Sequence, residues 1–352
     1  MNISWVVANA TEEQLDEMCL NVTYYLAVHL GMSRSPVFLP VCITYLTIFM
    51  VGVLGNSLTC AVILRYRVMR TPTNYYLLSL AVSDLLVLLL GMPLELYEMW
   101  QNYPFLFGEG GCYFKTFLFE TVCFASILNV TALSVERYVA VVHPLKVKHM
   151  TTRAHVKRVI FTLWGLSMLC AAPNTSLQGI VVLPPMFGRQ FPQSATCLVK
   201  PTWIYNLIIL ISTVVFFLLP MLIISILYLL IGLRLHRERV VMAADNNSSF
   251  GSESVSTSHQ RRLSVLVVVF GLCWAPFHLD RLAWSYMNET SEEHNRIFEH
   301  VHIISGVCFY LSSAINPILY NLMSTRFREM FSHITCYSNS RNKTATTPIT
   351  SR

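Results

Sequence analysis

Of the ionisable side chains inside the long apolar segments of this 352-residue chain, three are the first candidates for a chemical role. They are Glu95, Glu120 and Arg281. A charge inside a membrane span costs at least about 2.5–3.5 kcal/mol on insertion scales, so each one needs a structural or functional reason. Two carboxylates close together suit a planar guanidinium, because it can donate bidentate hydrogen bonds to each of them.

Helix geometry gives the depth and the face of the two glutamates. Glu95 follows Asp84 by close to three helical turns, so it shares the same inward face about 16 Å nearer the outside. Glu120 lies two turns before Ile127 on another segment. Both carboxylates are therefore expected near the outer end of an inward-facing surface.

Arg281 lies two turns after Trp274, which gives it a similar depth on a third segment. We expect Glu95, Glu120 and Arg281 to line one outward-facing cavity, with Glu98 near its rim. Such a cavity is net acidic, and most acidic residues of the chain also lie on this outer side. The pattern predicts a cationic ligand.

Asp84 is the deepest charge, midway along its apolar segment. Asn56 and Asn316 can share a hydrogen-bond network with it, and Ser126 and Ser312 can complete a small sodium site built from oxygen ligands. A packing network without an ion explains the same residues. The sequence leaves both interpretations open.

The elements that must position these residues are membrane-spanning helices. Apolar residues make up 54% of the chain and charged residues only 12%, which excludes an ordinary soluble protein. About 20 helical residues cross a hydrocarbon core, and continuous apolar runs without alternation favour helices over a barrel. The sequence predicts an all-α membrane protein, a seven-transmembrane helix bundle, with spans at 38–64, 74–100, 112–142, 158–173, 203–235, 263–286 and 298–322.

Basic residues indicate the orientation of this bundle, because lysine and arginine accumulate on the cytoplasmic side. The N-terminus is therefore expected outside, and no cleavable signal peptide is recognised, so the first span directs insertion. Sequons at Asn2, Asn9 and Asn21 then lie in an outward tail open to glycosylation. The six basic residues assigned to the outer side are Arg34, Lys115, Arg189, Lys200, Arg281 and Arg296.

Glu136-Arg137-Tyr138 closes the third span at its cytoplasmic edge. Arg137 either extends to the lipid headgroups or pairs with Glu136 in the resting state and is released when the bundle opens. Bends are predicted at prolines, which remove intrahelical hydrogen bonds. Prolines in five spans predict a bundle whose cytoplasmic ends can move, and they are Pro93, Pro173, Pro220, Pro276 and Pro317.

Three segments outside the bundle are assigned by composition. Residues 1–37 form the outer tail, 38–324 the bundle, 325–336 an amphipathic helix on the membrane surface and 337–352 a cytoplasmic tail. Residues 243–262 are polar and serine-rich, so we expect a disordered loop whose serines are either phosphorylated or merely solvated. Cys336 is either palmitoylated or an unmodified surface cysteine.

Taken in order, these features resemble the rhodopsin-like (class A) G-protein-coupled receptors over roughly residues 38–336. The ordered set is Asp84, Cys112 with Cys197, Glu136-Arg137-Tyr138, Trp164, CWAP at 273–276 and NPILY at 316–320. Longer stretches, including FGEGGCYFKTFLFETVCFASILNV and CWAPFHLDRL, resemble the neuromedin U receptors within the ghrelin, motilin and neurotensin receptor group. LYLLIGLRLHRERV and TTRAHVKRV resemble the type 1 branch more closely than type 2.

The resemblance implies roles for individual residues. Arg137 would contact the G protein, Cys112 would form a disulfide with Cys197, and Trp274 would be the toggle of activation. The remaining switch residues implied are Pro220, Ile127, Phe270, Tyr228, Asn316, Pro317 and Tyr320.

The resemblance also implies the ligand, an amidated arginine-containing peptide of the neuromedin U and neuromedin S type whose arginine is held by Glu95 and Glu120. Signalling through Gq-class G proteins to phospholipase C and calcium is implied as well, with arrestin and receptor kinases as further partners. The other residues expected to line the site are Arg281, Tyr205, Trp284, His302, Phe309 and Tyr310.

Other functional classes fit less well. Phe119 stands where amine receptors of this fold carry an aspartate, and residues 297–322 contain no lysine for a retinal Schiff base. An ion-translocating transporter is the main alternative from another class, but matched half-repeats are not recognised. An enzyme would need a second deep catalytic group beside Asp84. Another amidated peptide of the same group remains the nearest alternative ligand.

Overall fold

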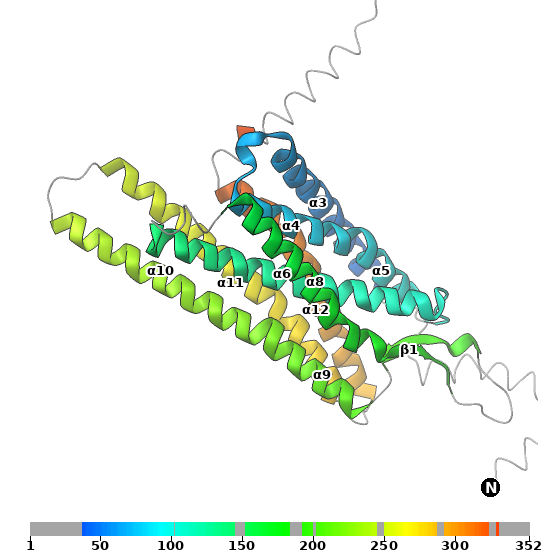
Figure 1. The fold of residues 1–352 in the computed structure, drawn as a ribbon. Coiled ribbons are helices and arrows are strands. Elements are labelled where there is room, and N and C mark those ends of the chain that lie inside the picture. Colours follow the sequence, from blue (N-terminus) through cyan, green and yellow to red (C-terminus); the bar gives the residue numbers. More distant parts are fainter. Residues whose placement is uncertain are drawn as a thin grey trace, which may run out of the picture.

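The computed structural model describes residues 37–101, 103–144, 152–183, 192–199, 202–244, 250–286, 292–323 and 329–330. In this part of the chain, seven helical segments run alongside one another in a single bundle, and a short hairpin lies at one end (Figure 1). The first four segments are α3 (Phe38–Arg65), then α4 (Pro72–Leu86) continued by α5 (Met92–Trp100), α6 (Gly108–Val142) and α8 (Arg153–Ser176). The last three are α9 (Trp203–Thr213) continued by α10 (Leu219–Ala244), α11 (Phe250–Tyr286) and α12 (Glu292–Met323).

Six of these segments are long and apolar enough to cross a membrane, judged over the described residues. The remaining segment, α11, is a continuous helix that packs between α10 and α12. Together the segments confirm the all-α bundle predicted from composition. The fold therefore places Glu95 on α5, Glu120 on α6 and Arg281 on α11.

Threonine side chains begin three of the helices. Thr71 accepts a hydrogen bond from the Asn74 amide at 3.3 Å, and Pro72 occupies the first turn. Thr152 accepts from the His155 amide at 3.2 Å in the same way, and Thr202 caps α9. An N-cap hydroxyl satisfies an amide that the helix leaves unpaired, so these polar residues define where the chain re-enters the apolar phase.

Two of the five prolines follow short π-helical segments. η2 (Val87–Gly91) precedes Pro93 and η4 (Val214–Leu218) precedes Pro220. A proline cannot donate to the carbonyl four residues back, and the wider turn removes that demand without ending the helix. Pro173, Pro276 and Pro317 instead lie within α8, α11 and α12.

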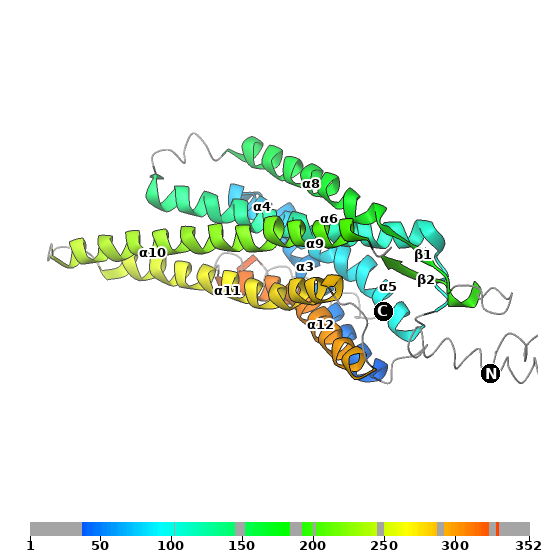
Figure 2. The ribbon, with the colours of Figure 1, turned by 90° about the horizontal axis from the view of Figure 1, so that it is seen from below.

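The expectation of a disordered loop at 243–262 is wrong for most of the segment. α10 continues to Ala244 and α11 begins at Phe250, so their backbones extend well beyond the apolar stretches. Figures 1 and 2 show this pair projecting beyond the other helices at the end opposite the hairpin. Extending an existing helix fixes one residue per added hydrogen bond, whereas a new helix needs a costly nucleus, so polar residues can continue a helix that an apolar span has started.

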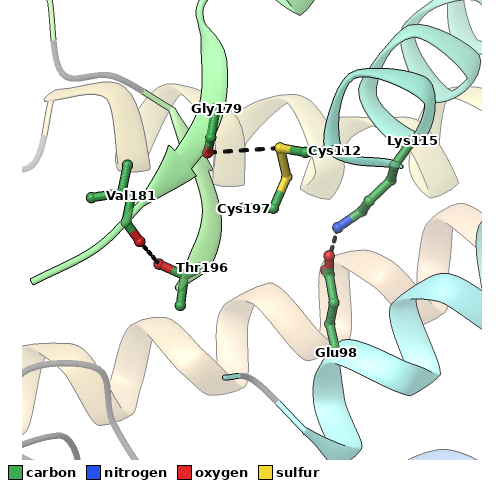
Figure 3. The surroundings of a disulfide bond; sticks show 7 residues. All are labelled: Glu98, Cys112, Lys115, Gly179, Val181, Thr196 and Cys197. Atoms are coloured by element: carbon green, nitrogen blue, oxygen red, sulfur yellow. Dashed lines mark hydrogen bonds and ion pairs between the residues drawn. A yellow bond between two sulfur atoms is a disulfide. The ribbon is translucent and has the colours of Figure 1, made fainter. Parts of the chain in front are cut away.

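A two-stranded hairpin lies at the end of the bundle where α6 begins. β1 (Gln178–Val181) pairs antiparallel with β2 (Thr196–Val199), with Ile180 opposite Cys197. The Cys112–Cys197 disulfide joins β2 to the first turns of α6, with the two Cα atoms 5.6 Å apart (Figure 3). This bond confirms the pairing that the resemblance implied, and it fixes the hairpin beside α6.

Removing this bond is predicted to destabilise the fold. Cys197→Ala should lower the unfolding free energy by about 2–4 kcal/mol, because the disulfide constrains a long loop in the unfolded chain. The thermal midpoint of the detergent-solubilised protein measures this, with Cys42→Ala, a free cysteine on α3, as the matched control. Equal midpoints for the two variants would contradict the prediction.

Candidate ligand-binding site

A buried ion pair joins α6 to α11. Arg281 Nη2 lies 2.5 Å from Glu120 Oε1, and Arg281 Nη1 donates to Glu120 Oε2 at 3.2 Å. Asn174 on α8 donates a third hydrogen bond, 2.7 Å long, to Oε1. Glu120 is only 4% exposed, so the carboxylate exchanges water almost entirely for these three donors. The arrangement ties three helices together at one charge.

This pair changes the electrostatics expected from the sequence. A carboxylate has about four lone-pair positions, and three nitrogen atoms of the protein already contact the two oxygens of Glu120. Its charge is compensated by Arg281, which was expected only to line the same cavity. Glu120 is therefore not a free acceptor for a second guanidinium in this conformation.

Glu95 has a different environment. Its Oε1 accepts a hydrogen bond from Tyr45 Oη at 2.9 Å, and its Oε2 accepts one from Tyr310 Oη at 2.7 Å. Both tyrosines have no exposed surface, and their ring centroids lie 5.1 Å apart. The carboxylate thus links α5 to α3 and α12 through neutral donors. Among the ion pairs of the described residues, none includes Glu95.

Two further charged pairs lie around this site. Glu98 on α5 forms an ion pair with Lys115 on α6, close to the disulfide (Figure 3). Asp280 on α11 contacts Nδ1 of His302 on α12 at 2.8 Å, and the other oxygen of this buried carboxylate, Oδ1, has no hydrogen-bond partner. The net negative charge predicted for the rim is therefore reduced by Lys115. The described part of the site holds four carboxylates, those of Glu95, Glu98, Glu120 and Asp280. Among these four, Glu95 is the one that is partly exposed and in no ion pair with a described residue.

Aromatic rings connect the two carboxylate clusters. Phe119, next to Glu120, lies 4.7 Å from Phe309 between ring centroids, and Phe309 contacts Tyr310 at 5.3 Å. Trp274 stacks on Phe270 at 4.9 Å and meets the edge of Phe309 at 5.3 Å. Of the other expected wall residues, Tyr205 is buried and Trp284 is 48% exposed. These rings thus form a continuous aromatic cluster that runs from the neighbour of Glu120 to the partner of Glu95.

The deep polar cluster forms only in part: among the described residues Asn316 hydrogen-bonds to Asp84, whereas Asn56, Ser126 and Ser312 bond to other groups. Asn316 Nδ2 donates to Asp84 Oδ2 at 2.9 Å, whereas Asn56 donates to the backbone oxygen of Ser313 at 3.0 Å. Ser126 shares a hydrogen bond with Ser83, 3.0 Å long. Ser312 donates to the Phe309 carbonyl at 2.6 Å. These oxygens are of the type that a hard cation takes, so they fit sodium, and sodium binding stays a prediction.

Comparison with known proteins decides the family. Residues 55–320 match the family described as 7 transmembrane receptor (rhodopsin family). The chain is 58% identical to human neuromedin-U receptor 1 over 322 residues, which is 88% of this chain and 76% of the relative. It is 52% identical to human neuromedin-U receptor 2 over 334 residues, 95% of this chain and 80% of the relative. Identity to mouse growth hormone secretagogue receptor type 1 is 36% over 333 residues, 93% of this chain and 86% of the relative.

The chain belongs to the rhodopsin family of seven-transmembrane receptors. Within that family it groups with the neuromedin-U receptors, as its motifs indicated. It is a multi-pass membrane receptor of the neuropeptide class that acts with G proteins, and not an enzyme.

The contacts near the C-terminal end of α6 differ from one of the two arrangements considered for Arg137. Glu136 accepts a hydrogen bond from Tyr76 Oη at 3.1 Å, and the ion pairs among described residues do not include one between Glu136 and Arg137. Arg137 instead lies close to Tyr228, and its Nε has no hydrogen-bond partner. Tyr76 on α4 therefore takes the place expected for the neighbouring arginine.

Several expected sites lie outside what the structure describes. These are the sequons at Asn2, Asn9 and Asn21, the lipidation candidate Cys336, most of the surface helix 325–336 and the side chain of Tyr320. The remaining predicted switch residues, Pro220, Ile127 and Pro317, lie on α10, α6 and α12. Their roles in activation stay predictions.

Four side chains of the receptor's site escaped the sequence argument: Tyr45, Asn174, Asp280 and, as a partner of Glu98, Lys115. A signal existed for Asp280, which is a charged group within the predicted span 263–286, whereas Asn174 lies one residue beyond the predicted span 158–173 and within the longer α8 of the structure. No comparable signal marks Tyr45, since a tyrosine in a span is most often packed like any other large apolar residue.

Breaking the buried pair is predicted to cost more than removing both charges. Arg281→Gln leaves the Glu120 carboxylate uncompensated, so the unfolding free energy of the receptor should fall by about 3–5 kcal/mol. Glu120→Gln/Arg281→Gln should recover part of this loss, because neutral amides can pair. The thermal midpoint is measured for the solubilised receptor without peptide, in the unaltered form, in Glu120→Gln, in Arg281→Gln and in the double variant. If the loss in the double variant equals the sum of the two single losses, the pairing is contradicted.

Proposed function

We propose that this receptor lies in the plasma membrane with its N-terminus outside and responds to the amidated neuropeptides neuromedin U and neuromedin S. The observation that carries the proposal is 52–58% identity to receptors named for neuromedin U over most of the chain. The half-buried carboxylate of Glu95, which is in none of the ion pairs among the described residues, supports a ligand with an arginine near its end. The pyrokinin-1 receptor of Drosophila, at 34% identity, is a more distant relative, so its named peptide is the less favoured ligand.

The first contact of the peptide's guanidinium is with Glu95. Two of the carboxylate's lone-pair positions accept from Tyr45 and Tyr310, which leaves about two for a bidentate guanidinium. Glu120 can join only if Arg281 moves, since Arg281 occupies it from two nitrogens. Arg281 in turn keeps unused N–H donors that can bind a peptide carbonyl.

This exchange gives the ligand a means to bias conformation. A ligand shifts an equilibrium only by its difference in affinity for the two states. If Arg281 leaves Glu120 for the peptide, the direct link between α6 and α11 is replaced by contacts through the ligand, and α11 is released to move. The aromatic cluster around Trp274 then carries the displacement toward the cytoplasmic half of α11.

On the cytoplasmic side, the same proposal includes coupling to Gq-class G proteins, phospholipase C and calcium release, followed by receptor kinases and arrestin. Arg137 is the group that meets the G protein once α11 has moved outward. Sodium at Asp84 is expected to stabilise the resting state, because the cation fits the oxygens of the packed cluster.

The ligand proposal is tested with three peptides in a calcium assay: the amidated peptide, its free acid, and an amidated analogue with citrulline in place of the arginine nearest the C-terminus. Citrulline keeps the shape and removes the charge. Glu95→Gln should reduce the potency of the arginine peptide about 10- to 100-fold, since charge-assisted hydrogen bonds contribute roughly 1.5–3 kcal/mol. The citrulline peptide should lose far less.

The control for this experiment is Glu109→Gln, the same chemical change at an exposed outer position of α6. It should leave all three potencies nearly unchanged. Equal responses of the unaltered receptor to the arginine and citrulline peptides would remove cation recognition from the proposal.

Arg137→Ala tests the cytoplasmic half of the mechanism. Peptide binding at the cell surface should persist, because Arg137 lies at the opposite end of α6 from Glu120. The calcium response should fall at least tenfold, because the contact with the G protein is lost. A normal response at equal surface expression would exclude Arg137 from coupling.

A further inference from the structure

Gly306 on α12 lies against the Glu95 cluster. A Cβ built on Gly306 would lie 2.4 Å from Tyr45 Oη and 2.9 Å from Glu95 Oε1. The first distance is shorter than real Cβ contacts ever show, so any larger residue would displace the hydroxyl, the carboxylate or the helix. The space that a side chain would fill is occupied by the two polar atoms that form the 2.9 Å hydrogen bond.

This glycine differs from the other closely packed glycines that the structure describes. At Gly52 and Gly55 the added atom would meet carbons of Leu88 and Pro317, at 2.6 and 2.9 Å, and at Gly271 it would meet the methyl carbon of Met221. Those contacts are apolar helix packing. At Gly306 the nearest atoms belong to a phenol and a carboxylate.

The orientation of the Glu95 carboxylate depends on two tyrosine hydroxyl groups, one on each of its oxygens. Tyr45 holds Oε1 from α3, and Tyr310, one turn beyond Gly306 on α12, holds Oε2. A single added methyl group would act on the Tyr45 side while leaving the Tyr310 hydroxyl in place. The carboxylate would then turn about its remaining hydrogen bond, which changes the direction of the lone pairs left for a ligand.

We propose that Gly306 and Tyr45 are positioning residues that fix the direction of the Glu95 carboxylate and so set the receptor's preference for a guanidinium over a neutral group of the same shape. This proposal rests on the proposed function, because it assigns the cation of the peptide to Glu95. Neither residue needs to contact the ligand. Phenols are suited to the task because they orient the carboxylate by hydrogen bonding without neutralising its charge.

The test measures the potency of the arginine peptide divided by the potency of the citrulline peptide, and this quotient is the ratio compared. The four receptors are the unaltered one, Gly306→Ala, Tyr45→Phe and the double variant. Gly306→Ala should reduce the ratio at least fivefold. Tyr45→Phe removes one donor and should reduce it about two- to fivefold. In the double variant the hydroxyl that the new methyl group meets most closely is absent, and only its 2.9 Å approach to Glu95 Oε1 remains. The ratio should therefore be no lower than in Gly306→Ala alone and should recover part of the way toward that of Tyr45→Phe.

Gly165→Ala is the matched control, because a Cβ on this α8 glycine meets nothing within 4 Å. Its ratio should equal that of the unaltered receptor. The ratio is measured at matched surface expression, so a purely structural loss of receptor leaves it unchanged. If Gly306→Ala fails to reach the surface, Tyr45→Phe decides the matter alone, since it adds no volume.

The outcomes separate the two proposals. An unaltered receptor that does not distinguish arginine from citrulline overturns both the cation recognition and this inference. A receptor that distinguishes them and keeps the full ratio in Gly306→Ala or in Tyr45→Phe overturns the positioning role only. Multiplicative losses in the double variant would place the two residues in independent roles and also overturn it.

Discussion

A charge inside an apolar helix bundle persists only if another part of the protein compensates it, and this constraint shapes the outer half of the receptor. Removing an ion from water carries a penalty of several kcal/mol even after relaxation. The chain meets that penalty in two ways. Glu120, Glu98 and Asp280 each lie against a basic side chain, whereas Glu95 is held by two neutral phenols. In the first arrangement a basic side chain lies beside the carboxylate, whereas in the second the described contacts are with neutral hydroxyl groups.

The two arrangements also differ in which helices they join. The Glu120 pair links α6 to α8 and α11, while the Glu95 cluster links α3, α5 and α12. A peptide that engages both clusters therefore touches most of the bundle through two carboxylates. Because packed interiors are close to crystalline in density, a change in one link is accommodated by rigid displacement of helices rather than by local compression. In the proposed mechanism the Glu120–Arg281 pair is the link whose loss would free α11 from α6.

The helical periodicity of the sequence was sufficient to predict how deep along their helices Glu120 and Arg281 lie. The repeat of each helix gave Glu120 and Arg281 a common depth, which agrees with their ion pair, and the cost of intramembrane polar groups favoured a polar partner for Asp84. The π-helical η2 between Asp84 and Glu95 was not part of that repeat. Which side chain faces which across the bundle did not follow. Glu120 and Arg281 were placed at one depth, but depth does not specify whether two charges share a ligand or pair with each other. That choice depends on side-chain reach between helices far apart in the chain, and the repeat of a single helix contains no information about it.

The same limit explains Tyr45 and Gly306. A tyrosine and a glycine in spans carry no pattern that separates packing from positioning, and only the approach of α3 to α12 brings Tyr45, Glu95 and Gly306 together. The serine-rich segment at 243–262 shows the converse case, in which composition predicted disorder but helices already nucleated in the membrane continued past their apolar residues. Local composition therefore predicts what a segment would do alone, and the bundle decides what it does when its neighbours are already folded. For the carboxylates this means that the charge of the site cannot be obtained by counting acidic residues in the sequence. It depends on how many of them have no basic side chain beside them once the helices have packed.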